Sequence, residues 1–328
     1  MSEKEGEREE AEGGKLAIRD VKERGRLQGF VMGLSPRLRE AKTQFRVFVK
    51  RPLSMAGLCI VVFYISLALL APMVMPPPPG SFDPYIIPKT FSTSPLPPSA
   101  AHPFGTSGPS YYSDILYGVV WGSRVSQIIA ISVVLISLAF GIVIGSVAGY
   151  FGRLSDDVLM RTTDIFFALP GLVLAMVLLL VLGRSITTVI IAVSVVWWPS
   201  YARLVRGEFL RIKNELYVEA AHATGVSDLK IIFKHILPNA IYPVLVVATM
   251  DVGSVVLVAS ALGFLGIGAQ PGTAEWGVLI SISRNWLLHG AWWSTFFPGI
   301  AIFTFVLGWT LLGDGLRDLL DPRARRSI

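Results

Sequence analysis

The amino-acid sequence predicts an all-α membrane protein with six transmembrane helices. Of its 328 residues, 52% are hydrophobic and only 16% are charged, a balance too apolar for a soluble domain of this length. Six apolar stretches are each long enough to cross the ~30 Å of hydrocarbon in a bilayer. Such an arrangement also places 25 of the 29 Lys and Arg residues on one side of the membrane.

The chain begins with residues 1–53, which we expect to be cytosolic and which contain no apolar run typical of a signal peptide. Residues 1–14 hold six glutamates and predict a disordered acidic tail, whereas residues 15–53 carry a net charge of +8. This basic juxtamembrane arm either lies on anionic lipid headgroups or only fixes the orientation of the chain. Residues 54–75 follow as an uncleaved transmembrane anchor helix.

The segment at 76–122 is predicted to be extended and external. It contains 11 of the 21 prolines of the chain, including four in a row at 76–79. Because proline removes a backbone donor and fixes φ, such a segment favours an extended, semi-rigid conformation over helices.

Residues 123–316 are predicted to form a core of five further helices, followed by a cytosolic C-terminal tail at 317–328. Gly141, Gly145 and Gly149 repeat every four residues on one face of the second span and predict close helix packing, within the subunit or against a partner. Pro170 and Pro199 are expected to bend their helices or end them early. The spans of the core are expected at 124–149, 163–182, 186–205, 240–264 and 295–313.

The orientation follows from the positive-inside rule. With a cytosolic N-terminus, the cytosolic loops and ends receive all Lys and Arg residues except Lys89, Arg124, Arg184 and Arg284. The opposite orientation would invert the rule at every short loop. Both termini are therefore expected in the cytosol, together with the polar stretch at 208–239.

That polar stretch predicts two helices joined at a tight corner. Residues 208–223 have strong helix formers and apolar residues at helical spacing, while Gly225 and Ser227 predict a stop and a new N-cap. A second short helix at 228–237 is expected to end at Pro238. The result is a rigid elbow, slim at its alanines and carrying one fixed charge at Glu219.

The residues of this elbow carry a family resemblance. Glu219, Ala220 and Ala221 are followed by Gly225 and by Leu237 and Pro238, and further motifs occur as WWPSYARLVRG at 197–207, FLGIGAQP at 264–271, EWG at 275–277, FPGIAI at 297–302 and GDGLRDLLDPR at 313–323. Over about residues 45–323 the chain resembles the inner-membrane permeases of binding-protein-dependent ABC importers. The wording FKHILPN, with His235, is similar to the dipeptide, oligopeptide and nickel subgroup, in its second-permease C type.

The resemblance implies the type I ABC importer permease fold and a role as half of the translocation pathway of an ATP-driven importer in the cell membrane. The implied partners are a second homologous permease, two cytosolic ABC ATPase subunits, an extracytoplasmic substrate-binding protein and the lipid bilayer, with no nucleic acid. The residues implied to contact the ATPase are Glu219, Ala220, Ala221, His222, Ala223, Thr224, Gly225, Leu237 and Pro238.

The outer segments at 76–122 and 269–294 are expected to form the rim at which the binding protein docks. The alternative is that 76–122 only caps the helices. Four tryptophans, Trp276, Trp286, Trp292 and Trp293, lie in the second of these segments and favour an interfacial aromatic belt over stacking on substrate.

Asp251 lies near the middle of the fifth predicted span, where a carboxylate facing lipid would cost at least ~2.5 kcal/mol. It is therefore expected to face either a watery path or a polar partner. One hypothesis is that Asp251 lines the translocation pathway and meets a cationic or hydroxyl-rich solute. The other is a buried structural hydrogen bond.

Enzyme functions are disfavoured. The sequence has no phosphate-binding loop of the G-x-x-x-x-G-K-[ST] type and no G-x-S-x-G motif. Its four histidines are scattered without ligands at metal-binding spacing, so neither a metal site nor a cofactor is predicted in this chain. ATP and magnesium would instead be bound by the partner ATPase subunits.

Peptides are the substrate class that the resemblance implies, and oligosaccharides or nickel are the alternatives within the same role. A secondary transporter or channel independent of ATP would also explain six spans and Asp251. It would leave the elbow at 208–239 without a purpose. A membrane-embedded enzyme would need a cluster of acids or histidines at matching depth, which the sequence does not contain.

Overall fold

The structure is a computed structural model that describes residues 48–49, 51–79, 81, 83–88, 94–107 and 114–320. The acidic tail, nearly all of the basic arm and residues 321–328 lie outside the described residues. The chain divides at Arg51 into two compact units, and the second, from Pro52 onward, contains every helix discussed below.

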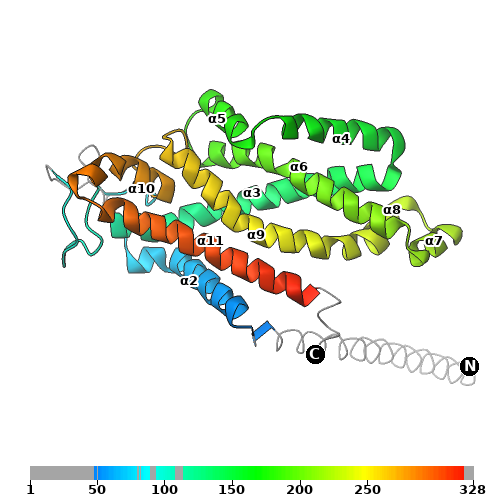
Figure 1. The fold of residues 1–328 in the computed structure, drawn as a ribbon, viewed down its shortest axis with the longest axis horizontal. Helices are drawn as coiled ribbons and strands as arrows, with labels where there is room; N and C mark the ends of the chain where they lie inside the picture. Colours follow the sequence, from blue (N-terminus) through cyan, green and yellow to red (C-terminus); the bar gives the residue numbers. More distant parts are fainter. Residues whose placement is uncertain are drawn as a thin grey trace, which may run out of the picture. The chain divides into compact units, whose positions relative to one another are not determined.

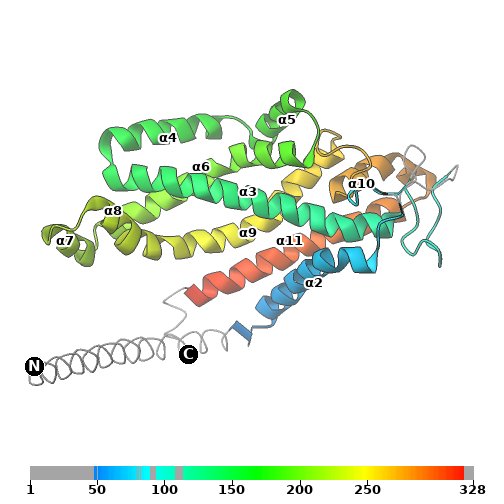
Figure 2. The same cartoon turned by 180° about the vertical axis from the view of Figure 1, so that it is seen from behind.

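Helices build this second unit, and the described residues form no strand beyond two isolated bridges. Figures 1 and 2 show α2 and α11 on one side, α4 and α5 on the other, and α3, α6 and α9 between them. The predicted all-α membrane fold is confirmed. The elements are α2 (Pro52–Val74), α3 (Ile115–Phe151), α4 (Arg153–Ala168), α5 (Gly171–Leu182), α6 (Ile186–Lys213), α7 (Leu216–Ala223), α8 (Asp228–Ile231), the π-helical η1 (Ile232–Ile236), α9 (Leu237–Phe264), α10 (Trp276–Ser283), the 3₁₀-helical η2 (Arg284–His289) and α11 (Trp293–Leu320).

Five stretches are long and apolar enough to cross a membrane: α2, α3, α6, α11 and the run from α8 to α9. A sixth candidate crossing is the pair of α4 and α5, whose axes are bent by 86°. In Figure 1, α4 begins at the end of the bundle where α3 finishes, and α6 begins at the opposite end. Counted as one crossing, the bent pair brings the five spans to the predicted six.

The span predicted at 163–182 is broken at Pro170, the residue expected to bend its helix or end it early. The helix α4 already begins at Arg153, and the chain breaks at Leu169 and Pro170 before α5 starts. Leu169 is extended, with φ −94° and ψ 134°, because the ring of a following proline disfavours the helical conformation. The other proline, Pro199, lies inside the unbroken α6, so it does not end its helix.

The helix α3 packs along α6 through its glycines. A Cβ atom on Gly141 or Gly145 would overlap Tyr201 or Ala202 of α6, and one on Gly149 would lie 2.6 Å from Cβ of Phe209. Because no hydrophobic force drives helices together in lipid, such close backbone approach is a main source of their association. The repeat lies within the subunit, between α3 and α6.

At the outer end of the bundle, the helix α3 begins earlier than predicted. The helix α3 starts at Ile115, capped by Asp114, whose side chain accepts from the amide of Tyr117 at 3.0 Å. Residues 115–122, for which the sequence predicts an extended conformation, are therefore helical. The described residues between 76 and 107 form no helix, as their prolines predict.

The two outer segments pair with each other. The amide of Ile87 donates to the carbonyl of Gly272 at 2.9 Å, and that of Ala274 donates to Tyr85 at 2.7 Å. Trp276 is fully buried and donates to the carbonyl of Val119 at 3.1 Å, so it is not part of an interfacial belt. Its position shows that the second outer segment folds inward over the bundle.

Glu275 fixes the start of α10 inside this outer end. Its fully buried carboxylate accepts from the amides of Gly277 and Val278 at 3.0 and 2.9 Å and from the hydroxyl of Ser260 at 3.1 Å. Burial raises the pKa of this carboxyl above its usual value, although the three hydrogen bonds act in the opposite direction. The EWG motif therefore joins α10 to α9.

We expect Gly145→Leu to destabilise the α3–α6 pair by about 1–3 kcal/mol, because a larger side chain would meet Ala202 and Val205. The measurement is the midpoint of thermal unfolding in detergent. Gly207→Leu is the matched control, since a Cβ on this glycine of α6 meets no atom within 4 Å. Equal midpoints for the two variants would contradict the packing role of Gly145.

Candidate coupling elbow

The predicted elbow is formed by α7, the turn at 224–227, α8 and η1. In Figures 1 and 2 it projects at the end of the bundle where α3 passes into α4. The helix α2 begins and α11 ends toward this same end. The elbow joins two spans directly, since α6 leads into it and α9 continues from it.

The first arm is shorter than predicted. A single helix at 208–223 is wrong, because α6 ends at Lys213 and α7 starts at Leu216. Asn214 caps α6, its side-chain amide donating to the carbonyl of Leu210 at 3.2 Å, and Glu215 is extended. Asparagine competes for backbone hydrogen bonds in this way, which makes it a poor interior helix residue and a good helix end.

The second arm is longer than predicted, since the helix does not end at Pro238. It runs from α8 through η1 and into α9, with Pro238 in the first turn of α9. Proline in a helix would lose a hydrogen bond and clash with the preceding turn. Here the preceding turn is a wider π-helix, in which the amide of Leu237 donates to the carbonyl of Ile232, and the chain passes without a break.

The corner between the arms is a Schellman motif. Gly225 has φ +78°, its amide donates to the carbonyl of His222 at 3.0 Å, and the amide of Val226 donates to Ala221 at 3.1 Å. The hydroxyl of Thr224 adds bonds to the carbonyls of Ala220 and Ala221 at 3.1 and 3.0 Å. The predicted stop at Gly225 thus has a left-handed backbone that only glycine adopts without strain.

Most of the predicted coupling residues are exposed. Glu219, Ala220, His222, Ala223, Thr224, Gly225 and Pro238 are exposed, Leu237 is half-buried and Ala221 is buried against the protein's own core. Sequence reasoning missed four exposed apolar side chains of the elbow, which we call the elbow apolar group: Leu216, Tyr217, Leu229 and Phe233. These four side chains differ from core residues because they are exposed, and they differ from lipid-facing residues because they lie outside the predicted spans.

The inner face of the elbow belongs to the hydrophobic core. Val218 of α7, Ile231 of α8 and Ile236 of η1 are each at most 1% exposed. The side-chain amide of Asn239 also donates to the hydroxyl of Tyr217 at 3.1 Å and to the carbonyl of His235 at 2.7 Å. The elbow is therefore packed on the bundle and does not hang from it as a loose loop.

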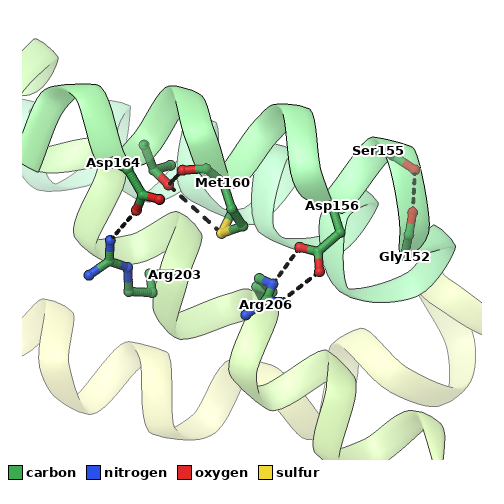
Figure 3. Close-up of polar contacts among 8 residues, drawn as sticks. Gly152, Ser155, Asp156, Met160, Asp164, Arg203 and Arg206 are labelled. Atoms are coloured by element: carbon green, nitrogen blue, oxygen red, sulfur yellow. Dashed lines mark hydrogen bonds and ion pairs between the residues drawn. The ribbon is translucent and has the colours of Figure 1, made fainter.

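The helix α4 is joined to α6 by two ion pairs. Figure 3 shows Arg206 binding both carboxylate oxygens of Asp156, at 2.5 and 2.6 Å, and Arg203 binding Asp164 at 2.7 Å. Within α4 only Thr163 is buried. The arginines of the WWPSYARLVRG motif thus hold a helix whose apolar contacts are few.

Asp251 lies on α9 and accepts a hydrogen bond from the indole nitrogen of Trp197 on α6 at 3.0 Å. The residue is half-buried. This contact supplies the polar partner expected of a carboxylate at that depth.

Among the described residues, no group of three or more His, Cys, Asp or Glu side chains is arranged to hold a metal ion.

Comparisons with known proteins agree with this architecture. Residues 141–326 match the family described as the binding-protein-dependent transport system inner membrane component. Residues 41–98 match the N-terminal TM domain of oligopeptide transport permease C. The first match alone covers more than half of the chain.

Three curated relatives match along nearly their whole length. The dipeptide transport system permease protein DppC of Alkalihalophilus pseudofirmus is 38% identical, covering 86% of this chain and 89% of the relative. The probable D,D-dipeptide transport system permease protein DdpC of Escherichia coli is 38% identical, covering 83% and 88%. The oligopeptide transport system permease protein OppC of Bacillus subtilis is 35% identical, covering 88% and 90%.

Among solved structures, a chain of the MetNI methionine ABC transporter in an inward-facing conformation aligns with 63% of this chain and 98% of its own length, at 15% identity and a TM-score of 0.49. The family assignment rests on the sequence matches. With a helical bundle of up to six crossings and these matches, the chain belongs to the family of inner-membrane permease components of binding-protein-dependent ABC transport systems.

Proposed function

We propose that this chain forms half of the translocation pathway of a peptide importer and couples to two ATPase subunits through the elbow. The observation that carries this proposal is the continuity of the elbow with two spans. One arm follows α6 after a single break at 214–215, and the other runs without a break into α9. A displacement of the elbow would therefore tilt both helices.

The proposed orientation places the elbow, the start of α2 and the end of α11 in the cytosol. The positive-inside rule supports this side, because 25 of the 29 Lys and Arg residues belong to the loops and ends at it. A second homologous permease would complete the pathway, and a substrate-binding protein would dock on the paired outer segments. Both termini would then be cytosolic.

In this proposal the chain itself is not catalytic. ATP and magnesium bind to the ATPase subunits, whose closure would move the elbow and open the pathway outward, and hydrolysis would reset it. Such gating requires only that the elbow contacts differ between two states of the partner. The exposed Glu219 and the elbow apolar group supply one charge and a set of apolar anchors for that contact.

The proposed substrates are short peptides. The printed names of the relatives refer to dipeptide, D,D-dipeptide and oligopeptide transport. Asp251 is proposed to line the pathway, where its carboxylate would favour solutes with a positive charge. Oligosaccharides and nickel are the alternative substrates. A ligand-binding assay with the partner binding protein would have to exclude them.

We expect Gly225→Pro to abolish uptake and ATPase retention while the spans still insert. Proline cannot adopt φ +78° and has no amide hydrogen for the carbonyl of His222. The measurement is co-purification of the ATPase subunits together with ATP-dependent uptake in vesicles. Gly183→Pro is the matched control, because Gly183 also has positive φ and open space but lies between α5 and α6 at the opposite end. Full transport by the Gly225→Pro protein would contradict the coupling role.

We expect Glu219→Lys to weaken ATPase binding about tenfold or more, because it reverses the one charge that the elbow is proposed to offer to the partner. Binding of purified ATPase subunits to permease in nanodiscs measures the effect. Asp157→Lys, which changes an exposed acid of α4 near the same end, should leave the affinity unchanged. Equal affinities for both variants would remove Glu219 from the contact.

We expect Asp251→Asn to lower the uptake of dilysine relative to diglutamate by roughly tenfold, the effect of about 1.4 kcal/mol of lost charge attraction. Asparagine can still accept the hydrogen bond from Trp197, so the thermal unfolding midpoint should change little. Trp197→Phe removes that hydrogen bond and leaves the charge in place. An unchanged uptake ratio in the Asp251→Asn protein would reduce Asp251 to a structural role.

A further inference from the structure

Tyr150, at the end of α3, touches both arms of the elbow with one hydroxyl group. Its side chain is buried, and the residue is 4% exposed. The hydroxyl donates to Oδ1 of Asp228 at 2.6 Å, at the start of α8, and lies 3.1 Å from Nε2 of His222, near the end of α7. Between these two contacts lies the Gly225 corner, so the hydroxyl spans the corner from the side of the bundle.

The direction of the hydrogen bonds follows from the inventory of donors. A carboxylate can only accept, so the single hydroxyl proton of Tyr150 is given to Asp228. His222 must then carry a hydrogen on Nε2 and donate it to the tyrosine oxygen. The result is a chain from His222 through Tyr150 to Asp228, with its last bond strengthened by the charge of the carboxylate.

Lys213 attaches the end of α6 to the same residue. Its ammonium group donates to the backbone carbonyl of Tyr150 at 2.5 Å and lies 5.3 Å from the centre of the tyrosine ring. The imidazole of His222 stacks on that ring at 6.3 Å with only 9° between the planes. Four elements, α3, α6, α7 and α8, therefore meet at one side chain.

We propose that Tyr150 is a positioning residue that locks the elbow angle to α3, so that a displacement of the elbow carries α3 with it. This inference rests on the proposed coupling function and names the route by which the motion leaves the elbow. The spans α6 and α9 receive the motion along the chain. The span α3 is not joined to the elbow along the chain. Tyr150 and Lys213 join it to the elbow by non-covalent contacts instead.

The experiment uses the assembled complex of this chain with its second permease and two ATPase subunits. In a Cys59→Ser background, spin labels are placed at Val143→Cys on α3 and Lys230→Cys on α8, both exposed positions. Pulsed electron paramagnetic resonance compares the label distance in the nucleotide-free and vanadate-trapped complexes. With the hydroxyl present, α3 and α8 move together and the mean distance is the same in both states.

We expect Tyr150→Phe to release the two helices from each other. The aromatic ring and its packing remain, and only the hydrogen-bond chain is lost. The distance between the labels should then differ between the two states by on the order of 2–5 Å, the scale of helix shifts in switching proteins. Retention of the ATPase subunits should be unchanged, because the hydroxyl is buried behind the exposed elbow surface.

Two further variants test whether the change in label distance comes from the lost hydrogen bond or from a folding defect. Asp228→Asn keeps an acceptor and should behave as the reference protein, whereas Asp228→Ala should reproduce Tyr150→Phe and add nothing when combined with it. Tyr64→Phe is the matched control, since its hydroxyl bonds to Ala301 and Thr304 of α11 and touches neither α3 nor the elbow. It should leave the distance unchanged.

The outcomes distinguish the two levels of the inference. A reference complex that retains no ATPase subunits would overturn the coupling function, and this inference with it. If the ATPase subunits are retained, equal distances in both states of the Tyr150→Phe complex would overturn the role of Tyr150 alone. A distance change in the reference protein, or loss of the ATPase subunits from the Tyr150→Phe complex, would do the same.

Discussion

The contact between α3 and α6 is the interaction on which the rest of the structure depends. It brings two backbones close enough that a methyl group on Gly145 would overlap the carbonyl of Ala202. In lipid this closeness matters more than apolarity, because the surrounding acyl chains are as apolar as the helices. The same pairing places the ends of α3 and α6 side by side, where Tyr150 and Lys213 meet the elbow.

The elbow and α4 are held to this pair in physically different ways. The elbow packs through buried apolar residues such as Val218 and Ile236, whose contacts are not subject to charge screening. The helix α4 is joined to α6 by an exposed ion pair of Arg203, which contributes little and is screened, and by a half-buried pair of Arg206 with Asp156. The structure therefore joins an elbow packed through apolar residues and a helix paired through charges to the same span.

Two carboxylates inside the bundle form hydrogen bonds that join one helix to another. Glu275 ties α10 to α9 at the outer end, and Asp251 ties α9 to α6 through Trp197. A buried carboxylate without partners would be costly, so each of these contacts restricts how the helices can slide. Opening the pathway would have to proceed by tilting helices while these bonds persist, or by breaking them.

The sequence by itself determined the features that depend on composition and on neighbouring residues. The number of spans follows from the length of apolar runs, and the corner at Gly225 follows from the need for a positive φ. Tertiary packing decided how Pro238 passes within a continuous helix and how Tyr150 meets His222 and Asp228, which lie 72 and 78 residues away. Backbone preferences are local and can be read along the chain, whereas contacts between distant residues exist only after α3 and α6 have packed.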